Sequence, residues 1–230
     1  MRPRVVLHNA VSADGRIDWF EPDVGLFYEL AGRWGEDATL VGADTLLAAP
    51  EETAAEETAE PASAPVEGDE RPLLAVVDSR GRARAWDRWL RAGPWRGGVA
   101  LCAGSTPTEH LDYLDARGIE QLVAGEQRVD LAAALDWLAE RHGVRTVRVD
   151  SGGTLNGVLL RAGLVDEVSV LVHPALVGGM SPRSLFRASD LENAGGVVPL
   201  SLEAVERVRR DVVWLRYAVN REEGAGAWRS

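Results

Sequence analysis

The sequence has 230 residues, of which 46% are hydrophobic and 6% aromatic, a formal net charge of −11, and 25 basic residues that are all arginines. This composition is typical of a soluble globular protein without a membrane span, and the acidic balance argues against nucleic acid or an anionic membrane as partner. Cys102 is the only cysteine, which excludes a disulfide within the chain and a multi-cysteine zinc site.

The predicted elements begin with a strand at 5–7, and no signal-peptide pattern precedes it, so we expect a cytoplasmic protein. Apolar β-branched runs predict further strands at 39–41, 73–77, 98–101, 121–123, 146–149, 168–172 and 212–217. Helical spacing predicts helices at 26–34, 108–117, 131–142 and 154–162. Strands that alternate with helices predict an α/β fold with a mostly parallel central sheet flanked by helices, in one domain over 1–230.

Two segments differ from this alternation. The stretch at 51–70 is rich in Ala, Glu and Pro and has almost nothing to bury, so we expect an exposed acidic loop at about 50–70. The tail reads as two strands, 205–210 and 211–219, which predict a C-terminal antiparallel hairpin. Its edge would carry Val212, Trp214 and Tyr217, which a monomer must leave open or cover.

Gly152 and Gly153 lie between a predicted strand and a predicted helix, in "VDSGGTLNG". Glycine there would serve a turn with positive φ, the close approach of another backbone, or the close approach of a ligand. We favour the ligand, because the first N–H groups of the helix suit a phosphate and Thr154 can cap it. The G-x-G-x-x-G fingerprint is absent, so a Rossmann domain is not indicated.

The four histidines, His8, His110, His142 and His173, are scattered and show no metal-ligand spacing, so we expect no metal site. His173 precedes Pro174 at a strand end, where a structural role is favoured over a catalytic one.

Four separated stretches then resemble one family: "LHNAVSADGRID", "DATLVGADTLLA", "PLLAVVDSRGR" and "VDSGGTLNGVLLRAGLVDEVSVLVHPALVGG". In order and spacing they are similar to the reductase domain of riboflavin biosynthesis, the RibD C-terminal domain, whose fold is like dihydrofolate reductase. The resemblance implies a homodimeric, NADPH-dependent enzyme that transfers a hydride to C1′ of a phosphoribosylamino pyrimidine. Bifunctional relatives carry a zinc deaminase before this domain, which is missing here, so we expect a stand-alone reductase.

The resemblance also assigns cofactor contacts. They are Ala10, Trp19, Thr45, Ser79, Arg80, Gly152, Gly153, Thr154, Leu155, Asn156 and Gly157. Arg80 beside Ser79 suits a phosphate monoester, which favours NADPH over NADH. Trp19 either packs beside the cofactor or belongs to the core. Ser12, Asp14 and Gly15 would form a loop that covers the nicotinamide, where Asp14 is expected to hold the loop and Asp14-Gly15 is also an ordinary turn dipeptide.

On the substrate side the resemblance implies contacts from Arg33 and Asp150, which otherwise would be a solvent-facing arginine and a turn-capping carboxylate. Asp150 stands where the family usually has Glu, and a carboxylate there could hold the amide and amino edge of a pyrimidine. The family's Asp-Asp-Pro and Leu-Thr-x-Arg elements after the threonine are missing, so Arg33 or Arg183 would have to meet the ribose phosphate. Two alternatives therefore stay open: a reductase of another small heterocycle, such as a pterin, and a non-catalytic nucleotide-binding module.

Overall fold

A computed structural model describes residues 1–47, 69–84, 86–180 and 183–220. The chain divides into two compact units, one of Met1–Pro3 and Glu36–Val147 and one of Arg4–Gly35 and Arg148–Ser230. The predicted acidic loop lies outside the described residues except for Asp69 and Glu70. No helix in the described ranges has both the length and the apolar character to cross a membrane. The expectation of a single domain stays a prediction.

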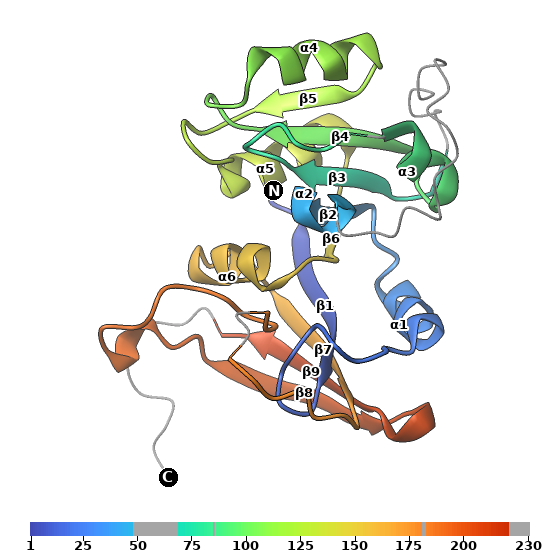
Figure 1. Cartoon of the computed structure of the whole chain (residues 1–230), viewed down its shortest axis with the longest axis vertical. Helices are drawn as coiled ribbons and strands as arrows, with labels where there is room; N and C mark the ends of the chain where they lie inside the picture. The colour runs from blue at the N-terminus through green and yellow to red at the C-terminus, as the bar shows by residue number, and fades with distance from the viewer. Residues whose placement is uncertain (48–68, 85, 181–182, 221–230) are drawn as a thin grey trace. The chain divides into compact units, whose positions relative to one another are not determined.

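The first unit contains a parallel set of strands. In spatial order they are β2 (Ala38–Gly42), β3 (Leu73–Val77), β4 (Gly97–Cys102) and β5 (Glu120–Val123), as Figure 1 shows. The helices of this unit are α2 (Ala43–Leu47), α3 (Trp86–Ala92), α4 (Thr108–Ala116) and α5 (Leu131–His142). The short helices α2 and α3 are absent from the sequence prediction. The strand β6 (Thr146–Val149) contains the boundary between the two units.

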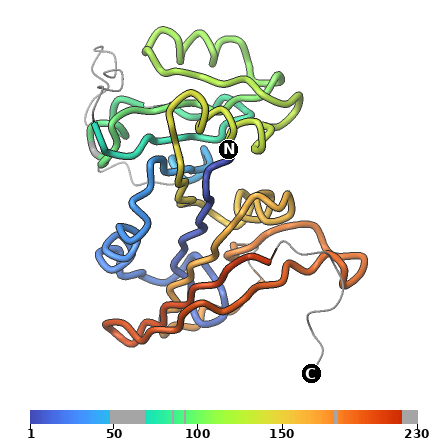
Figure 2. Tube along the Cα trace, turned by 180° about the vertical axis from the view of Figure 1, so that it is seen from behind, coloured from blue at the N-terminus to red at the C-terminus, as the bar shows by residue number. Residues whose placement is uncertain are grey.

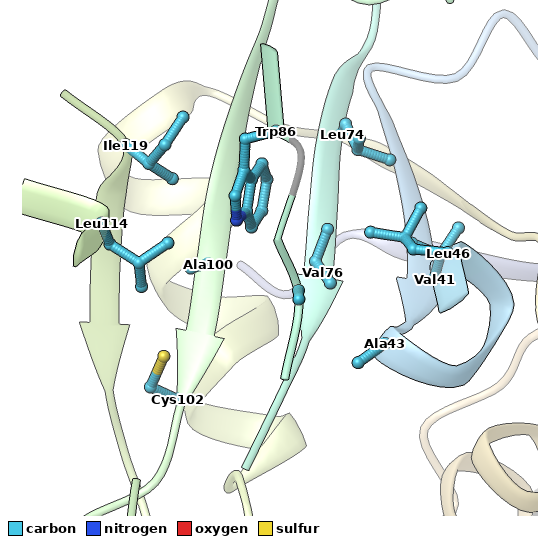
Figure 3. Packing of buried hydrophobic residues seen from close by; sticks show 11 residues of the cluster. Val41, Ala43, Leu46, Leu74, Val76, Trp86, Ala100, Cys102, Leu114 and Ile119 are labelled. Carbon is cyan, nitrogen blue, oxygen red and sulfur yellow. The ribbon is translucent and has the colours of Figure 1, made fainter. Parts of the chain in front are cut away.

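The core of the first unit is built around Trp86, which is 1% exposed and lies among aliphatic side chains of the strands (Figure 3). Its ring packs on β4 at Gly98, where an added Cβ would lie 2.9 Å from a ring carbon. Glycine is therefore required at 98 because the indole occupies the space of a side chain.

The second unit combines parallel and antiparallel pairs. Its elements are β1 (Arg4–Ser12), α1 (Val24–Ala31), a 3₁₀ turn η1 (Gly32–Trp34), α6 (Gly153–Arg161), β7 (Glu167–His173), β8 (Leu200–Arg207) and β9 (Val213–Val219). Two further 3₁₀ turns are η3 (Ala194–Gly196) and η4 (Arg209–Asp211). Strand β1 pairs with β7 in parallel, whereas β9 pairs antiparallel with both β7 and β8. Figure 2 shows the β8–β9 hairpin in orange and red, which confirms the predicted C-terminal hairpin.

The hairpin differs from the prediction in what it exposes. Val212 and Trp214 are 1% and 2% exposed and pack in a core cluster with Phe27, so of the two predicted alternatives, an open or a covered edge, these side chains are covered within the chain. The exposed apolar side chains lie instead on β8, at Leu200, Leu202 and Val205. Strand β8 also begins earlier than predicted, because nearly all of its residues face solvent and leave no alternating pattern in the sequence.

Candidate active site

The turn between β6 and α6 answers the question raised by its glycines. Gly152, the N-cap of α6, has φ −77° and ψ 172°, so no left-handed conformation is needed there. An added Cβ at Gly153 would lie 2.1 Å from the carbonyl oxygen of Ser184, and one at Gly157 would lie 2.0 Å from that of Arg187. At both positions the close approach is that of another backbone segment, so of the three predicted explanations this one, rather than the ligand, accounts for Gly153. Gly152 has room, since its Cβ would meet only Ile17 at 3.6 Å.

Only part of this predicted cofactor loop reaches the surface. Gly153, Leu155, Asn156 and Gly157 are buried, whereas Gly152 is half-buried and Thr154 is exposed. Thr154 does not cap the helix, because α6 begins at Gly153 and its N-cap makes no side-chain hydrogen bond. The predicted cap is therefore wrong. Gly152 and Thr154 are the residues of this loop that a ligand could reach directly.

Asn156 ties the turn to two other segments. Its Nδ2 donates to the Asn9 Oδ1 on β1 and to the Leu185 carbonyl, both at 2.9 Å, and Asn9 donates in turn to the Ser151 carbonyl at 2.9 Å. Asn156 is completely buried. It therefore supports the turn from beneath.

Asp150 forms a charged cluster just beyond β6. Arg148, whose side chain is 4% exposed, donates from Nη1 to the Asp150 Oδ2 at 3.1 Å, and its Cζ lies 5.8 Å from the centre of the Tyr28 ring. Burial raises the pKa of Tyr28, and the charge of Asp150 and hydrogen bonding to it raise it further, against Arg148. The phenol therefore stays protonated near neutral pH. The Asp150 side chain is 27% exposed, so the cluster presents a carboxylate that Arg148 and the Tyr28 hydroxyl hold in place.

A buried network lies behind this cluster. His8 is 0% exposed, and burial lowers its pKa from 6.5 to about 4, with Arg148 lowering it further and a hydrogen bond to the Phe27 carbonyl opposing. The neutral ring donates from Nε2 to Phe27 at 3.0 Å, so Nδ1 accepts from the Ser169 hydroxyl at 2.9 Å. Ser169 accepts in turn from the Trp214 indole at 2.8 Å. Each side-chain polar atom of His8, Ser169 and Trp214 therefore has a hydrogen-bond partner, and these bonds require one tautomer of His8.

The loop after β1 is held by Asp14. Its carboxylate accepts from the Ser12 hydroxyl at 2.6 Å and from the backbone N–H groups of Val177 and Gly178 at 3.1 and 2.7 Å, and these bonds lower its pKa, Ser12 most. Gly15 has φ 78°, as a turn requires. Asp14 thus holds the loop, in agreement with the sequence prediction.

Trp19 is 86% exposed and has φ 63°, so its alternative assignment to the core is wrong. A left-handed conformation is unusual for a bulky residue and costs on the order of 1 kcal/mol or more. Ala10, by contrast, faces the apolar cluster around Trp214 and offers a ligand mainly its backbone.

Arg33 lies in the 3₁₀ turn after α1, and its side chain is exposed. The guanidinium carbon lies 5.6 Å from the centre of the Trp214 ring, a cation–π contact that restricts the side chain without burying it. Arg183 is 72% exposed and lies near Asp18, with 3.9 Å between Nε and Oδ2.

Three predicted contacts belong to the first unit. Thr45 is half-buried in α2, and Arg80 is exposed in the loop after β3. Ser79 is engaged twice: its carbonyl accepts from the Thr106 hydroxyl and its Oγ accepts from the Val129 N–H, both at 3.1 Å. The Ser79 hydroxyl hydrogen is left to donate. The structure thus brings Ser79 and Arg80 together on one loop.

The residues that contact Asp150 are absent from the sequence prediction. Arg148 could have been found, because it stands two residues before Asp150 at a strand end and so shares its face. Tyr28 comes from a helix about 120 residues earlier and leaves no local signal. His173, predicted to be structural, is 6% exposed, accepts from the Asp23 N–H at 3.0 Å and lies 3.2 Å from the Leu171 carbonyl, which agrees with that role.

Comparison with known proteins places these features in a family. Residues 3–214 match the family described as RibD C-terminal domain. A 2,5-diamino-6-ribosylamino-4(3H)-pyrimidinone 5′-phosphate reductase of Methanothermobacter thermautotrophicus is 34% identical over 93% of this chain and 97% of its own length. The enzyme of that name from Archaeoglobus fulgidus is also 34% identical, over 78% of this chain and 84% of its own.

Solved structures agree in fold. A pyrimidine reductase-like protein of Corynebacterium diphtheriae superposes with a TM-score of 0.72 at 18% identity, over 96% of this chain and 93% of its own. RibD of Acinetobacter baumannii gives a TM-score of 0.66 at 22% identity, over 95% of this chain and 58% of its own. The expected dihydrofolate reductase-like α/β fold, mostly parallel with a C-terminal antiparallel hairpin, is confirmed.

Proposed function

This chain belongs to the RibD C-terminal domain family, and we propose that it is an NADPH-dependent reductase of the riboflavin-biosynthesis type, acting at C1′ of a phosphoribosylamino pyrimidine. The observation that carries the proposal is the 34% identity along 97% of a relative named as a pyrimidinone phosphate reductase. The match over 3–214 includes residues of both units, which supports one reductase domain. The cytoplasmic location stays a prediction.

The cluster at Asp150 supports the substrate class. A carboxylate accepts hydrogen bonds only, and the ring of a 4(3H)-pyrimidinone presents an amide N–H to such a group. Arg148 occupies one position on Oδ2, which fixes the carboxylate and leaves lone pairs of both oxygens for other donors. Tyr28 stays protonated, and its hydroxyl hydrogen-bonds to Asp150, which helps to fix the carboxylate further. We assign pyrimidine binding to Asp150 and contact with the ribose phosphate to Arg33.

The residues that would hold NADPH fit it in part. Arg80 is exposed next to a serine hydroxyl, and Gly152 is half-buried at the N-terminus of α6, where the first N–H groups of a helix favour phosphate. Thr45, Ala10, Thr154 and the exposed Trp19 are the other accessible candidates. The buried Gly153, Leu155, Asn156 and Gly157 would act by shaping the turn. When bound, NADPH supplies the hydride.

The test is turnover by the purified chain. With NADPH and either the diaminopyrimidinone or the aminouracil ribosylamine phosphate, nicotinamide absorbance should fall, and NADPH should bind at least about tenfold tighter than NADH, about 1.4 kcal/mol. Asp150→Asn and Arg33→Ala should each raise KM about tenfold to hundredfold and leave NADPH affinity unchanged, as expected for losing a charge-assisted contact. No turnover of either pyrimidine would reject the proposal and favour another heterocycle.

We also propose a homodimer, with β8 at the interface. This strand is the outer strand of the hairpin and exposes three apolar side chains, at Leu200, Leu202 and Val205. A long exposed edge strand tends to pair with another chain. Light scattering should give about twice the monomer mass of 24.8 kDa, and Leu202→Lys should lower it towards the monomer value. A monomer mass for the unmodified chain would contradict the proposal.

A further inference from the structure

The loop at 78–84 wraps around one buried side chain, that of His110 on α4, which is 1% exposed. The Asp78 Oδ2 lies 3.5 Å from the His110 Nε2, and the Arg84 guanidinium contacts Nδ1. Gly81, with φ +64°, approaches so closely that an added Cβ would lie 2.8 Å from the His110 Cβ. The start, middle and end of the loop therefore all touch the same residue.

Asp78 closes the loop from within. Its carboxylate is 2% exposed and accepts from the Ala83 N–H at 2.6 Å, while its carbonyl accepts from the Gly81 N–H at 3.3 Å. Its Oδ1 has no hydrogen-bond partner among the described residues. Burying a carboxylate costs free energy unless the group is paired. We therefore infer that Asp78 serves to fix the conformation of the loop rather than to stabilise the fold.

His110 is held in a single protonation state. Burial lowers its pKa and the charge of Arg84 lowers it further, against the opposing effect of Asp78, so the ring is neutral at pH 7. The Arg84 guanidinium can only donate, so Nδ1 must accept and Nε2 must carry the proton. That nitrogen lies 3.5 Å from the Asp78 Oδ2 and makes no hydrogen bond among the described residues. The ring thus accepts from Arg84 at one end of the loop and makes a longer polar contact with Asp78 at the other.

This loop displays the two groups assigned to the cofactor phosphate. Ser79 is fixed by Thr106 and Val129, and Arg80 follows it with an exposed guanidinium. A serine hydroxyl and an arginine bind a phosphate monoester together only if the backbone holds them at the right separation, because a hydrogen bond weakens steeply when its donor is misplaced.

We propose that His110 and Asp78 are positioning residues that determine the preference for NADPH over NADH, by holding the loop at 78–84 in the conformation that presents Ser79 and Arg80 to the 2′-phosphate. The proposal rests on the proposed function, since it presumes a nicotinamide nucleotide as cofactor. Neither residue would touch the cofactor itself.

The experiment compares NADPH and NADH affinities by fluorescence titration of the full chain. His110→Leu should weaken NADPH binding at least about tenfold and change NADH binding less than about twofold, so that the preference collapses. His110→Asn keeps a hydrogen-bond acceptor for Arg84 and should retain part of the preference for NADPH. His142→Leu is the matched control, because His142 is a partly buried histidine of the same unit that lies near Glu120 rather than beneath the loop. It should leave the ratio of affinities unchanged.

A ratio that survives His110→Leu would overturn the proposal, as would an equal fall in both affinities, which is the result of a merely structural role. If His110→Leu does not fold, Asp78→Asn provides the same test, with the same result expected and the same results against it. If the unmodified chain binds neither NADPH nor NADH, the proposed function itself is rejected. Tight NADPH binding by the unmodified chain and an unchanged ratio in both variants would reject the inference alone.

Discussion

The loop at 78–84 in the first unit and the turn at 150–157 in the second both follow a buried strand, and both are predicted to contact a nucleotide. The loop is shaped by side chains beneath it, since Asp78 and His110 meet it at several points. The turn is shaped by backbone, since Ser184 and Arg187 approach Gly153 and Gly157 too closely for any side chain. One region therefore depends on polar groups and the other on the absence of Cβ atoms.

The two regions also differ in the hydrogen bonding of a buried histidine. His8, behind the Asp150 cluster, has a hydrogen-bond partner for each ring nitrogen. His110, beneath the loop, faces Arg84 on one side and has only a long contact of 3.5 Å to Asp78 on the other. A fully satisfied network fixes structure firmly, whereas a partly satisfied one leaves the loop easier to deform by substitution.

The largest loss of stability is expected where the backbone at 184–187 lies against the first turns of α6. Gly157→Ala should lower the free energy of unfolding by about 3 kcal/mol, because a Cβ placed 2.0 Å from the Arg187 carbonyl oxygen forces the two segments apart. Gly153→Ala should behave alike. Gly152→Ala is the matched control and should cost less than about 1 kcal/mol, since its nearest neighbour would lie at 3.6 Å. Urea denaturation measures all three, and equal effects at 152 and 157 would contradict the role assigned to the approaching backbone.

An intermediate effect is expected from His8 as the pH falls. Its pKa is about 4 when folded and 6.5 in an unperturbed chain, so the unfolded state takes up the proton first. The stability that the neutral ring contributes is fully present above pH 6.5 and is lost as the pH falls towards about 4. Between pH 7 and pH 5 the loss should be roughly 2 kcal/mol.

Other groups titrate in the same pH range, so the contribution of His8 must be measured as the difference between the unmodified protein and a variant that lacks the ring. Denaturation of the unmodified protein and of His8→Gln at pH 7 and pH 5 isolates the contribution of His8. A nuclear magnetic resonance titration of the His8 ring gives its pKa without any substitution. A midpoint near 6.5 would refute the buried neutral network.

The contrast between the two regions also explains what the sequence could and could not predict. Strands such as 73–77 and 146–149, and the helix at 131–142, match their predicted ranges, because their patterns of burial are local. The positions of Ser79 and Asp150 at strand ends follow from the same patterns. The reason for Gly153 does not, since it depends on residues about 30 positions later, and neither does Tyr28 beside Asp150. Contacts between distant segments decide these features, and a single sequence carries no record of them.

The smallest effect is expected at the outer side of the loop, where Arg82 donates to the Asp44 carboxylate at 2.7 Å. Both side chains are exposed, by 39% and 81%, so water screens the pair and Asp44→Asn should change the free energy of unfolding by less than about 0.5 kcal/mol. The ratio of NADPH to NADH affinity should also stay within about twofold of the unmodified chain, because the loop is held from beneath by His110 rather than from its surface. Added salt should leave both quantities nearly unchanged, since it screens a pair that contributes little. A large loss of stability or of cofactor preference in Asp44→Asn would mean that the surface ion pair shapes the loop, and the difference drawn between its inner and outer contacts would then be wrong.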